Sequence, residues 1–238
     1  MILISRGLLE SCGACEDGLR WFDSHVGNNL VDCQTLIDEC IKDNQDTYAM
    51  WLYKRFSMAY NNTTRTDGVF NGGRMTMILG SLHASRSIDC KGLLYVSGSL
   101  VARKSIEAHR VSCDYCWAGD VIVKSITTKR HLNVTNLSVQ DDAQAGTTIL
   151  VGNNARCGTL RADKGITIGG DLIADTVVSS EGIIVDGDVH IKSLISAGSH
   201  IRVLGTLYRR ANTLAKIVAG CQLPGNGRVT VGCYAEGN

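Results

Sequence analysis

The sequence predicts a mainly β protein whose chain winds into a single-stranded parallel β-helix. Segments that open with Gly, a small polar residue and then Leu or Val recur about every 18 residues, a period typical of solenoids. Apolar residues within each segment come in i, i+2 pairs, the spacing of one face of a strand. The 26 glycines and single proline suit a chain that turns often and keeps its backbone donors in hydrogen-bonded ladders.

The repeat units define the expected coils. They are clearest from residue 170, where GDLIADTVVSSEGIIVD is followed by GDVHIKSLISAGSHIRVL and then by GTLYRR. Aligned on the opening residue, the units begin at Gly80, Gly98, Gly119, Thr135, Gly152, Gly170, Gly187 and Gly205.

Each unit holds three apolar pairs and therefore three short strands. The residues expected to point inward in the units from Gly119, Gly170 and Gly187 are Val121, Val123, Ile126, Thr128, Leu132 and Val134; Leu172, Ala174, Val177, Ser179, Ile183 and Val185; and Val189, Ile191, Leu194, Ser196, Ile201 and Val203. Coils stacked about 4.8 Å apart would pair these strands in parallel and enclose an apolar interior.

A buried helix is the alternative interpretation of these segments. Frequent glycines, β-branched residues and the lack of a sustained i, i+3, i+4 pattern disfavour it. Left-handed β-helices carry a glycine-containing hexapeptide three times per coil, whereas only about one glycine per coil is regular here. We therefore expect a right-handed solenoid.

The segment GITIGGDLIADTVVSSEGIIVDGDVHIKSLI resembles the Gly-Asp-[Leu/Val] coils of bactofilins, a polymer-forming family. The resemblance covers about residues 78–210 and implies an apolar solenoid that self-assembles. The chain departs from that family at its N-terminus, where a long ordered-looking segment replaces a disordered, often proline-containing tail.

The N-terminal 60 residues have helical periodicity instead, and three amphipathic helices predict a small bundle. In SCGACEDGLRWFDSHVG the helix would begin after Ser11 as N-cap and stop at Gly27. In DTYAMWLYKRF the N-cap would be Asp46. The three apolar stripes are Cys15, Leu19 and Phe22; Leu30, Cys33, Ile37 and Cys40 or Ile41; and Tyr48, Trp51, Leu52 and Phe56.

Part of this block is similar to a helical module of bacteriophage and prophage accessory proteins, in which an AC-x-x-G-L-x-W-F helix precedes a helix carrying W-L. The matching residues are Ala14, Cys15, Gly18, Leu19, Trp21, Phe22, Trp51 and Leu52. The resemblance implies a phage or mobile-element context and no catalytic residue.

Four parts are expected along the chain. The polar stretch AYNNTTRTDGVFNGGRM indicates a boundary, ANTLAKIVAG a capping helix and GRVTVGCYAEG a closing strand. The predicted divisions are a helical module at 1–60, a linker at 61–77, the parallel β-solenoid at 78–210 and a C-terminal cap at 211–238.

Composition places the protein in the cytoplasm, or in the host cytoplasm if a phage encodes it. The sequence has no run of 18 apolar residues, so we expect no membrane association. Its ten cysteines are most simply interpreted as reduced thiols. A formal charge of +1 disfavours a strongly basic nucleic-acid binder or an acidic DNA mimic.

Two cysteine pairs have the spacing of zinc half-sites. Cys12 and Cys15 form the first, which Cys33 and Cys40 could complete, and Cys113 and Cys116 form the second. Cysteine is also a small, readily buried residue that suits helix and coil cores. We therefore expect no metal and no cofactor, with zinc at the N-terminal cysteines as the alternative.

No catalytic motif is present, and no small-molecule substrate is expected. In solenoid acyltransferases a histidine serves as general base, which makes His109 and His190 the candidates for that alternative. The aspartates at 120, 171 and 188 repeat beside corner glycines, and we interpret them as turn residues.

Basic clusters occur at Arg156, Arg161 and Lys164 and at Arg209, Arg210 and Lys216, without the aromatic residues typical of single-strand binders. Nucleic acid is therefore a possible but not favoured partner. The candidate residues for binding a protein are Trp21, Tyr53, Lys54, Arg55, Arg156, Arg161, Arg209 and Arg210.

The expected function is that of a non-enzymatic protein-binding protein. We expect a phage or mobile-element accessory protein that binds and inhibits a host complex, such as a defence complex, as a homo-oligomer. The alternatives are a bactofilin-like self-assembling scaffold and a β-solenoid acyltransferase.

Overall fold

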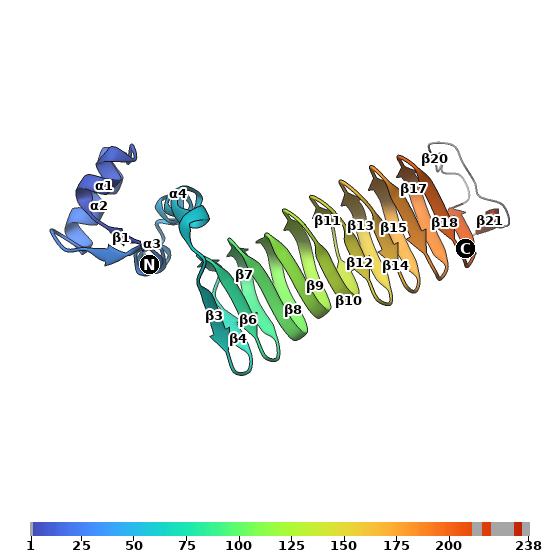
Figure 1. Cartoon of the computed structure of the whole chain (residues 1–238), viewed down its shortest axis with the longest axis horizontal. Coiled ribbons are helices and arrows are strands. Elements are labelled where there is room, and N and C mark those ends of the chain that lie inside the picture. Colours follow the sequence, from blue (N-terminus) through green and yellow to red (C-terminus); the bar gives the residue numbers. More distant parts are fainter. Residues whose placement is uncertain (1, 211–215, 220–230, 235–238) are drawn as a thin grey trace.

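The chain is a parallel β-solenoid with a helical module at its N-terminal end, as a computed structural model shows (Figure 1). It is 53% strand and 19% helix, and the solenoid makes about nine turns of about 17 residues each. The predicted fold class is confirmed. The structure describes residues 2–210, 216–219 and 231–234, with side chains up to Tyr208.

Each coil contributes one strand segment to each of three flat faces, and every segment pairs in parallel with its equivalents in the neighbouring coils. Face 1 contains β3 (Thr63–Thr66), β6 (Ser81–Ala84), the first parts of β8 (Ser99–Cys113), β9 (Tyr115–Thr128) and β10 (Leu132–Val139), then β12 (Ile149–Val151), β14 (Ile166–Ile168), β16 (Gly182–Val185) and β18 (His200–Val203).

The other two faces share the longer strands, which bend around a corner. Face 2 contains β4 (Phe70–Gly72), the first parts of β7 (Ile88–Val96), β13 (Ala155–Ala162), β15 (Leu172–Ser179) and β17 (Val189–Ala197), the middle parts of β8 and β9, the end of β10, then β19 (Leu207–Arg210) and β21 (Val231–Tyr234). Face 3 contains β5 (Met75–Ile78), β11 (Asp142–Ala145), β20 (Lys216–Ala219) and the ends of β7, β8, β9, β13, β15 and β17.

The apolar pairs expected to point inward do fill the interior in the units from Gly119 and Gly170, where all twelve residues are buried. The prediction is wrong for Leu194 and Ser196, because Ile195 and Ala197 point inward instead. The strand pairing shifts by one residue between the segments around Ala174 and Thr176. One extra residue in a strand exchanges its two faces.

The recurring Gly-Asp pair has a structural reason at the corner between faces 1 and 2. The Asp171 carboxylate accepts a hydrogen bond from the backbone N–H of Asp188, the next residue up the stack, at 2.8 Å. Asp188 does the same for the N–H of Thr206 at 2.7 Å, and Asn154 for the N–H of Asp171 at 2.8 Å. Each side chain thus satisfies a corner donor that the strand ladder leaves unpaired.

The glycine of the pair makes room for this acceptor. A Cβ atom on Gly187 would lie 2.3 Å from Oδ1 of Asp171 and 2.6 Å from the Gly170 carbonyl. Gly205 stands in the same relation to Asp188, at 2.5 Å. The repeat therefore reads Gly-Asp because the aspartate of one coil lies against the glycine of the next.

The opening residues of the repeat units do not all lie at the same corner of the coil. Gly80 and Gly98 directly precede the face 1 strands β6 and β8, whereas the opening residues from Gly119 onward follow a face 1 segment. This change accounts for the long spacing between Gly98 and Gly119.

The solenoid begins earlier than position 78. The segment 61–77, expected to be a linker, contains β3, β4 and most of β5, which pair in parallel with β6 and β7. At the other end, Lys216–Ala219 is strand β20 where a capping helix was predicted, and the closing strand appears as β21. The remainder of the predicted 211–238 cap lies outside the described residues.

The N-terminal module has four helices instead of three: α1 (Arg6–Ser11), α2 (Glu16–His25), α3 (Cys33–Lys42) and α4 (Asp46–Phe56), with a 3-10 turn at Ser57–Ala59. A short antiparallel pair joins β1 (Leu3–Ile4) to β2 (Val31–Asp32).

Helix α2 starts at Cys15 as N-cap and not at Ser11, which ends α1, because Gly13 turns the chain between them at φ 80°. Gly27 follows the end of α2 at φ 66°, as expected of a stop residue.

Two further helix predictions need correction. Asp46 is the first residue of α4 and not its cap, which is Gln45. Leu30 is exposed and precedes α3, whose N-cap Asp32 accepts a hydrogen bond from the N–H of Gln34.

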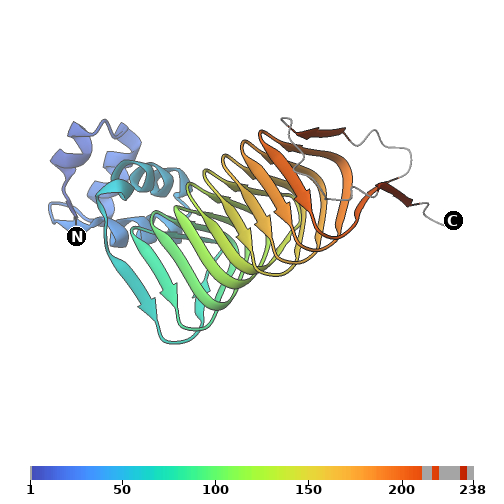
Figure 2. The same cartoon turned by 45° about the vertical axis from the view of Figure 1, so that its right-hand side comes forward.

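The module packs beside the first coils (Figure 2). Its apolar core includes Met77 of β5, so it lies on the outer side of face 3. Gln34 imitates a strand there: its side chain donates to the Met77 carbonyl at 2.7 Å and accepts from the Leu79 N–H at 2.8 Å. Arg74 binds Asp46 with two hydrogen bonds of 2.6 and 2.7 Å, which hold the pKa of that carboxyl below its usual range. Polar contacts and the buried Met77 therefore tie the module to the solenoid.

Replacement of the corner glycine tests the close approach of successive coils. Gly187→Ala should lower the free energy of unfolding by about 2 kcal/mol or more, because the added methyl overlaps backbone atoms that cannot move independently. Gly152→Ala is the matched control, since its Cβ would meet nothing closer than 3.7 Å. Chemical denaturation followed by circular dichroism distinguishes them, and equal stability of the two variants would contradict the corner geometry.

Removal of the corner acceptor tests the side-chain ladder, that is, the series of Asp and Asn side chains that accept hydrogen bonds from corner amides one coil further along. Asp171→Ala should cost about 1–2 kcal/mol, because the Asp188 N–H loses its partner. Asp171→Asn should cost much less, since it keeps an acceptor oxygen as Asn154 does one coil earlier. The same denaturation experiment measures both, and a harmless Asp171→Ala would show that water serves that amide equally well.

Candidate binding site in the helical module

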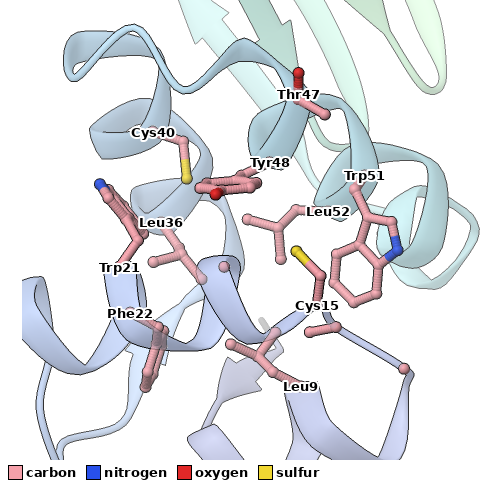
Figure 3. Close-up of a pocket in the computed structure, with 13 residues that line it drawn as sticks. Leu9, Cys15, Trp21, Phe22, Leu36, Cys40, Thr47, Tyr48, Trp51 and Leu52 are labelled. Atoms are coloured by element: carbon pink, nitrogen blue, oxygen red, sulfur yellow. The ribbon is translucent and has the colours of Figure 1, made fainter.

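The helical module encloses an apolar cavity of about 170 Å³ (Figure 3). All four helices contribute to its walls. The lining residues are Leu9, Gly13, Ala14, Cys15, Gly18, Trp21, Phe22, Leu36, Cys40, Thr47, Tyr48, Trp51 and Leu52. Cys15 and Thr47 are exposed, so the cavity opens to the surface on their side.

Small residues create the space on one side of the cavity. The Gly13 turn ends α1 and brings Cys15 to the start of α2. Gly18 lies in the first turn of α2, where an added Cβ would stand 3.5 Å from the Cys15 sulfur and 3.8 Å from the Tyr48 ring. A larger residue at 18 would therefore extend toward the cavity.

Four aromatic residues, Trp21, Phe22, Tyr48 and Trp51, also line the cavity, and a polar network orients Trp21. The Trp21 indole N–H donates to Asp43 at 3.0 Å, and its ring stacks on His25 with centroids 4.4 Å apart. The His25 Nε2 lies 2.8 Å from the same carboxylate. Tyr48 tilts against Trp21 at a centroid distance of 6.4 Å. This network fixes the Trp21 ring in the wall of the cavity.

The cavity wall offers hydrophobic contact and little acid–base chemistry. Burial raises the pKa of the Cys40 thiol to about 12, so it is protonated at neutral pH. Desolvation also raises the pKa of the Tyr48 hydroxyl, and nearby Cys15 and Asp17 add to that effect. A cavity of about 150 Å³ lined by apolar residues holds one benzene-sized group, whereas drug-sized ligands need about 300–1,000 Å³. The space therefore suits one bulky apolar group.

The four N-terminal cysteines do not gather into a metal site. Cys33 and Cys40 are buried on α3, where burial raises the pKa of each thiol to about 12. Cys12 is half-buried and Cys15 exposed. Nowhere in the described residues do three His, Cys, Asp or Glu side chains gather closely enough to hold a metal ion. Cys113 and Cys116 lie in the solenoid interior, where their mutual hydrogen bond and burial raise the pKa of Cys113.

The other predicted binding residues are dispersed over the molecule. Trp21 lines the cavity, and Lys54 and Arg55 are exposed at the end of α4. Tyr53 is half-buried between the module and the solenoid, with its ring centroid 6.0 Å from that of Tyr95. Desolvation raises its pKa, and Cys113 and Asp114 add to the shift.

The arginine cluster on β13 is divided between two faces. Arg156 points outward on face 2, in an open groove of about 600 Å³ that His109 also lines, and Arg161 points outward on face 3. His190 stacks on Tyr208 farther along face 2, at 4.5 Å. Arg209 and Arg210 lie on β19, and their side chains are outside the described residues.

Seven of the eight residues that carry the resemblance to phage modules line this one cavity, from the α1–α2 turn, α2 and α4. Leu19 is the exception and is buried elsewhere in the module. Leu9, Gly13, Leu36 and Thr47 were not singled out in the sequence, because only the arrangement of helices brings them to the cavity.

Searches of protein-family models, curated proteins and solved structures find no match to this chain. Among the helices in the described ranges, none has the length and apolar character needed to cross a membrane.

Two glycine substitutions in the module should change the free energy of unfolding in opposite directions, and they thereby test the local geometry. Gly18→Ala should raise the free energy of unfolding by about 0.5 kcal/mol, because alanine favours the helix and its methyl meets only ordinary contacts. Gly13→Ala should lower it by about 1 kcal/mol, since φ 80° strains any residue with a Cβ. Tryptophan fluorescence during urea denaturation measures both, and two changes of the same sign would contradict the assigned turn and helix.

Proposed function

We propose that this chain is a non-enzymatic protein-binding protein whose helical module receives a bulky apolar side chain of its partner. The observation that carries the proposal is the convergence of motif residues from two separate helices on one apolar cavity that opens to the surface. Buried apolar anchors in well-packed pockets supply most of the binding energy in protein interfaces.

The resemblance to phage and prophage accessory modules supports the choice of partner. In that context the partner is a complex of the host cell, such as a defence complex that binding would inhibit. The solenoid then serves as a rigid support, to which Gln34 and Arg74 fix the module in one orientation.

Filling the cavity tests the proposal. A tagged protein should capture its partner from bacterial lysate, and Gly18→Leu should abolish capture because the new side chain occupies the space of the anchor. Gly7→Leu is the matched control: Gly7 is exposed on α1, and no atom lies within 4 Å of its added Cβ.

Folding of each variant is checked by circular dichroism before capture. Capture that is unaffected by Gly18→Leu, with the variant folded, would overturn the cavity as the binding site. Capture lost equally in Gly7→Leu would show that the change, and not its position, is responsible.

A further inference from the structure

Face 1 of the solenoid differs from the other two faces in its outward residues. Across four consecutive coils its twelve outward positions hold no Asp, Glu, Lys or Arg: Tyr115, Trp117, Gly119, His131, Asn133, Thr135, Thr148, Leu150, Gly152, Gly165, Thr167 and Gly169. The equivalent positions hold five charged residues on face 2, namely Asp120, Lys124, Arg156, Asp171 and Asp175, and four on face 3, namely Lys129, Asp142, Arg161 and Asp163.

The centre of this face carries one continuous ladder of outward residues. In stacking order they are His83, Val101, Trp117, Asn133, Leu150, Thr167, Ile184 and Arg202. The side chains of Trp117 and Leu150 are 48% and 43% exposed. The helical module packs over face 3 and leaves this ladder uncovered.

We propose that face 1 is the interface of an antiparallel homodimer. The outward residues of one coil on this face form a rung, and the two-fold axis passes between the Asn133 and Leu150 rungs. This dimer would account for the homo-oligomer expected from the sequence, and it does not involve the cavity of the helical module. A second copy is the occupant that matches, because it repeats the same outward side chains at the same spacing of about 4.8 Å over the same number of coils.

This register is complementary in shape. It places the largest outward residue, Trp117, opposite Thr167 of the other copy, whose rung is flanked by Gly165 and Gly169. It also places Val101 opposite Ile184. Trp117 thus meets a rung of small residues, and Val101 meets an apolar partner.

The register is also complementary in charge. Arg103 and Asp186 occupy the same edge position on the rungs of Val101 and Ile184, and both are exposed. Neither forms an ion pair with another described residue. The two-fold axis brings Arg103 of one copy opposite Asp186 of the other, twice per dimer. A parallel dimer would instead oppose Trp117 to Trp117.

The available area is sufficient for a dimer. Eight rungs at about 4.8 Å and a width of about 16 Å give roughly 600 Å² of flat area per copy before side-chain relief is added. Specific protein–protein interfaces bury about 600–1,000 Å² per partner, so this face lies at the lower end of that range.

The first test is the molar mass in solution, measured by light scattering after size exclusion at micromolar concentration. The wild type should have twice the 25.6 kDa of one chain, and Leu150→Glu should have the mass of one chain. Ile173→Glu is the matched control, because Ile173 is 46% exposed on face 2, and it should remain dimeric. A monomeric wild type, a dimeric Leu150→Glu or a monomeric Ile173→Glu would overturn the proposal.

The second test examines the register of the dimer by reversing the charges that should face each other. Arg103→Glu and Asp186→Arg should each raise the dimer dissociation constant about tenfold, through repulsion between like charges. The double variant Arg103→Glu/Asp186→Arg should restore it. Failure of the double variant to restore the constant would overturn the register.

Different variants test the dimer and the binding cavity, so one proposal can fail without the other. Leu150→Glu leaves the cavity intact, so it should still capture the host partner as a monomer, whereas Gly18→Leu should remain dimeric. A Leu150→Glu variant that becomes monomeric and captures nothing would show that partner binding needs the dimer.

Discussion

The stacking of each coil on the next, in parallel and in register, is the constraint on which the rest of this protein depends. A coil of about 17 residues has too few contacts to fold alone, and it becomes stable when its strands pair with those of neighbouring coils. The strand ladders satisfy the backbone of the three faces but leave donors at the corners. Aspartate and asparagine side chains accept from those donors, as Asp171 does for Asp188, and glycine admits them.

This constraint also determines where the helical module sits. The outward residue Met77 belongs to the first coil and is buried in the core of the module, so one strand supports two cores. Gln34 pairs with the backbone on either side of Ile78 and thereby fixes α3 against the strand. A module attached in this way presents its cavity in a defined direction relative to the three faces. The cavity and face 1 are consequently separate surfaces of one rigid frame.

The sequence predicted the solenoid because period-two apolar pairs and corner glycines recur at every coil and leave few alternatives. It did not reveal the first coil, since strands such as TTRT are polar and lie among glycines, as in a linker. The shift at Leu194 was also hidden, because one extra residue leaves the pattern of apolar residues plausible in both registers. Helix α1 has only six residues and is too short to show periodicity.

The candidate sites were harder to predict than the fold. The motif residues around Trp21 and Trp51 have the same pattern whether they fill a core or line a cavity, and only the packing of the four helices distinguishes the two. The uncharged character of face 1 is present in the sequence, but it becomes visible only when residues such as Trp117 and Leu150 are assigned to one face.

Amide hydrogen exchange measured by nuclear magnetic resonance tests the stacked coils most directly. The amides of Asp171, Asp188 and Thr206 have side-chain acceptors one coil below, although they lie at corners outside the strand ladders. They should exchange as slowly as the neighbouring strand amides of Leu172 and Val189. Rapid exchange at all three corners beside protected strands would contradict the side-chain ladder, and rapid exchange throughout would contradict the solenoid itself.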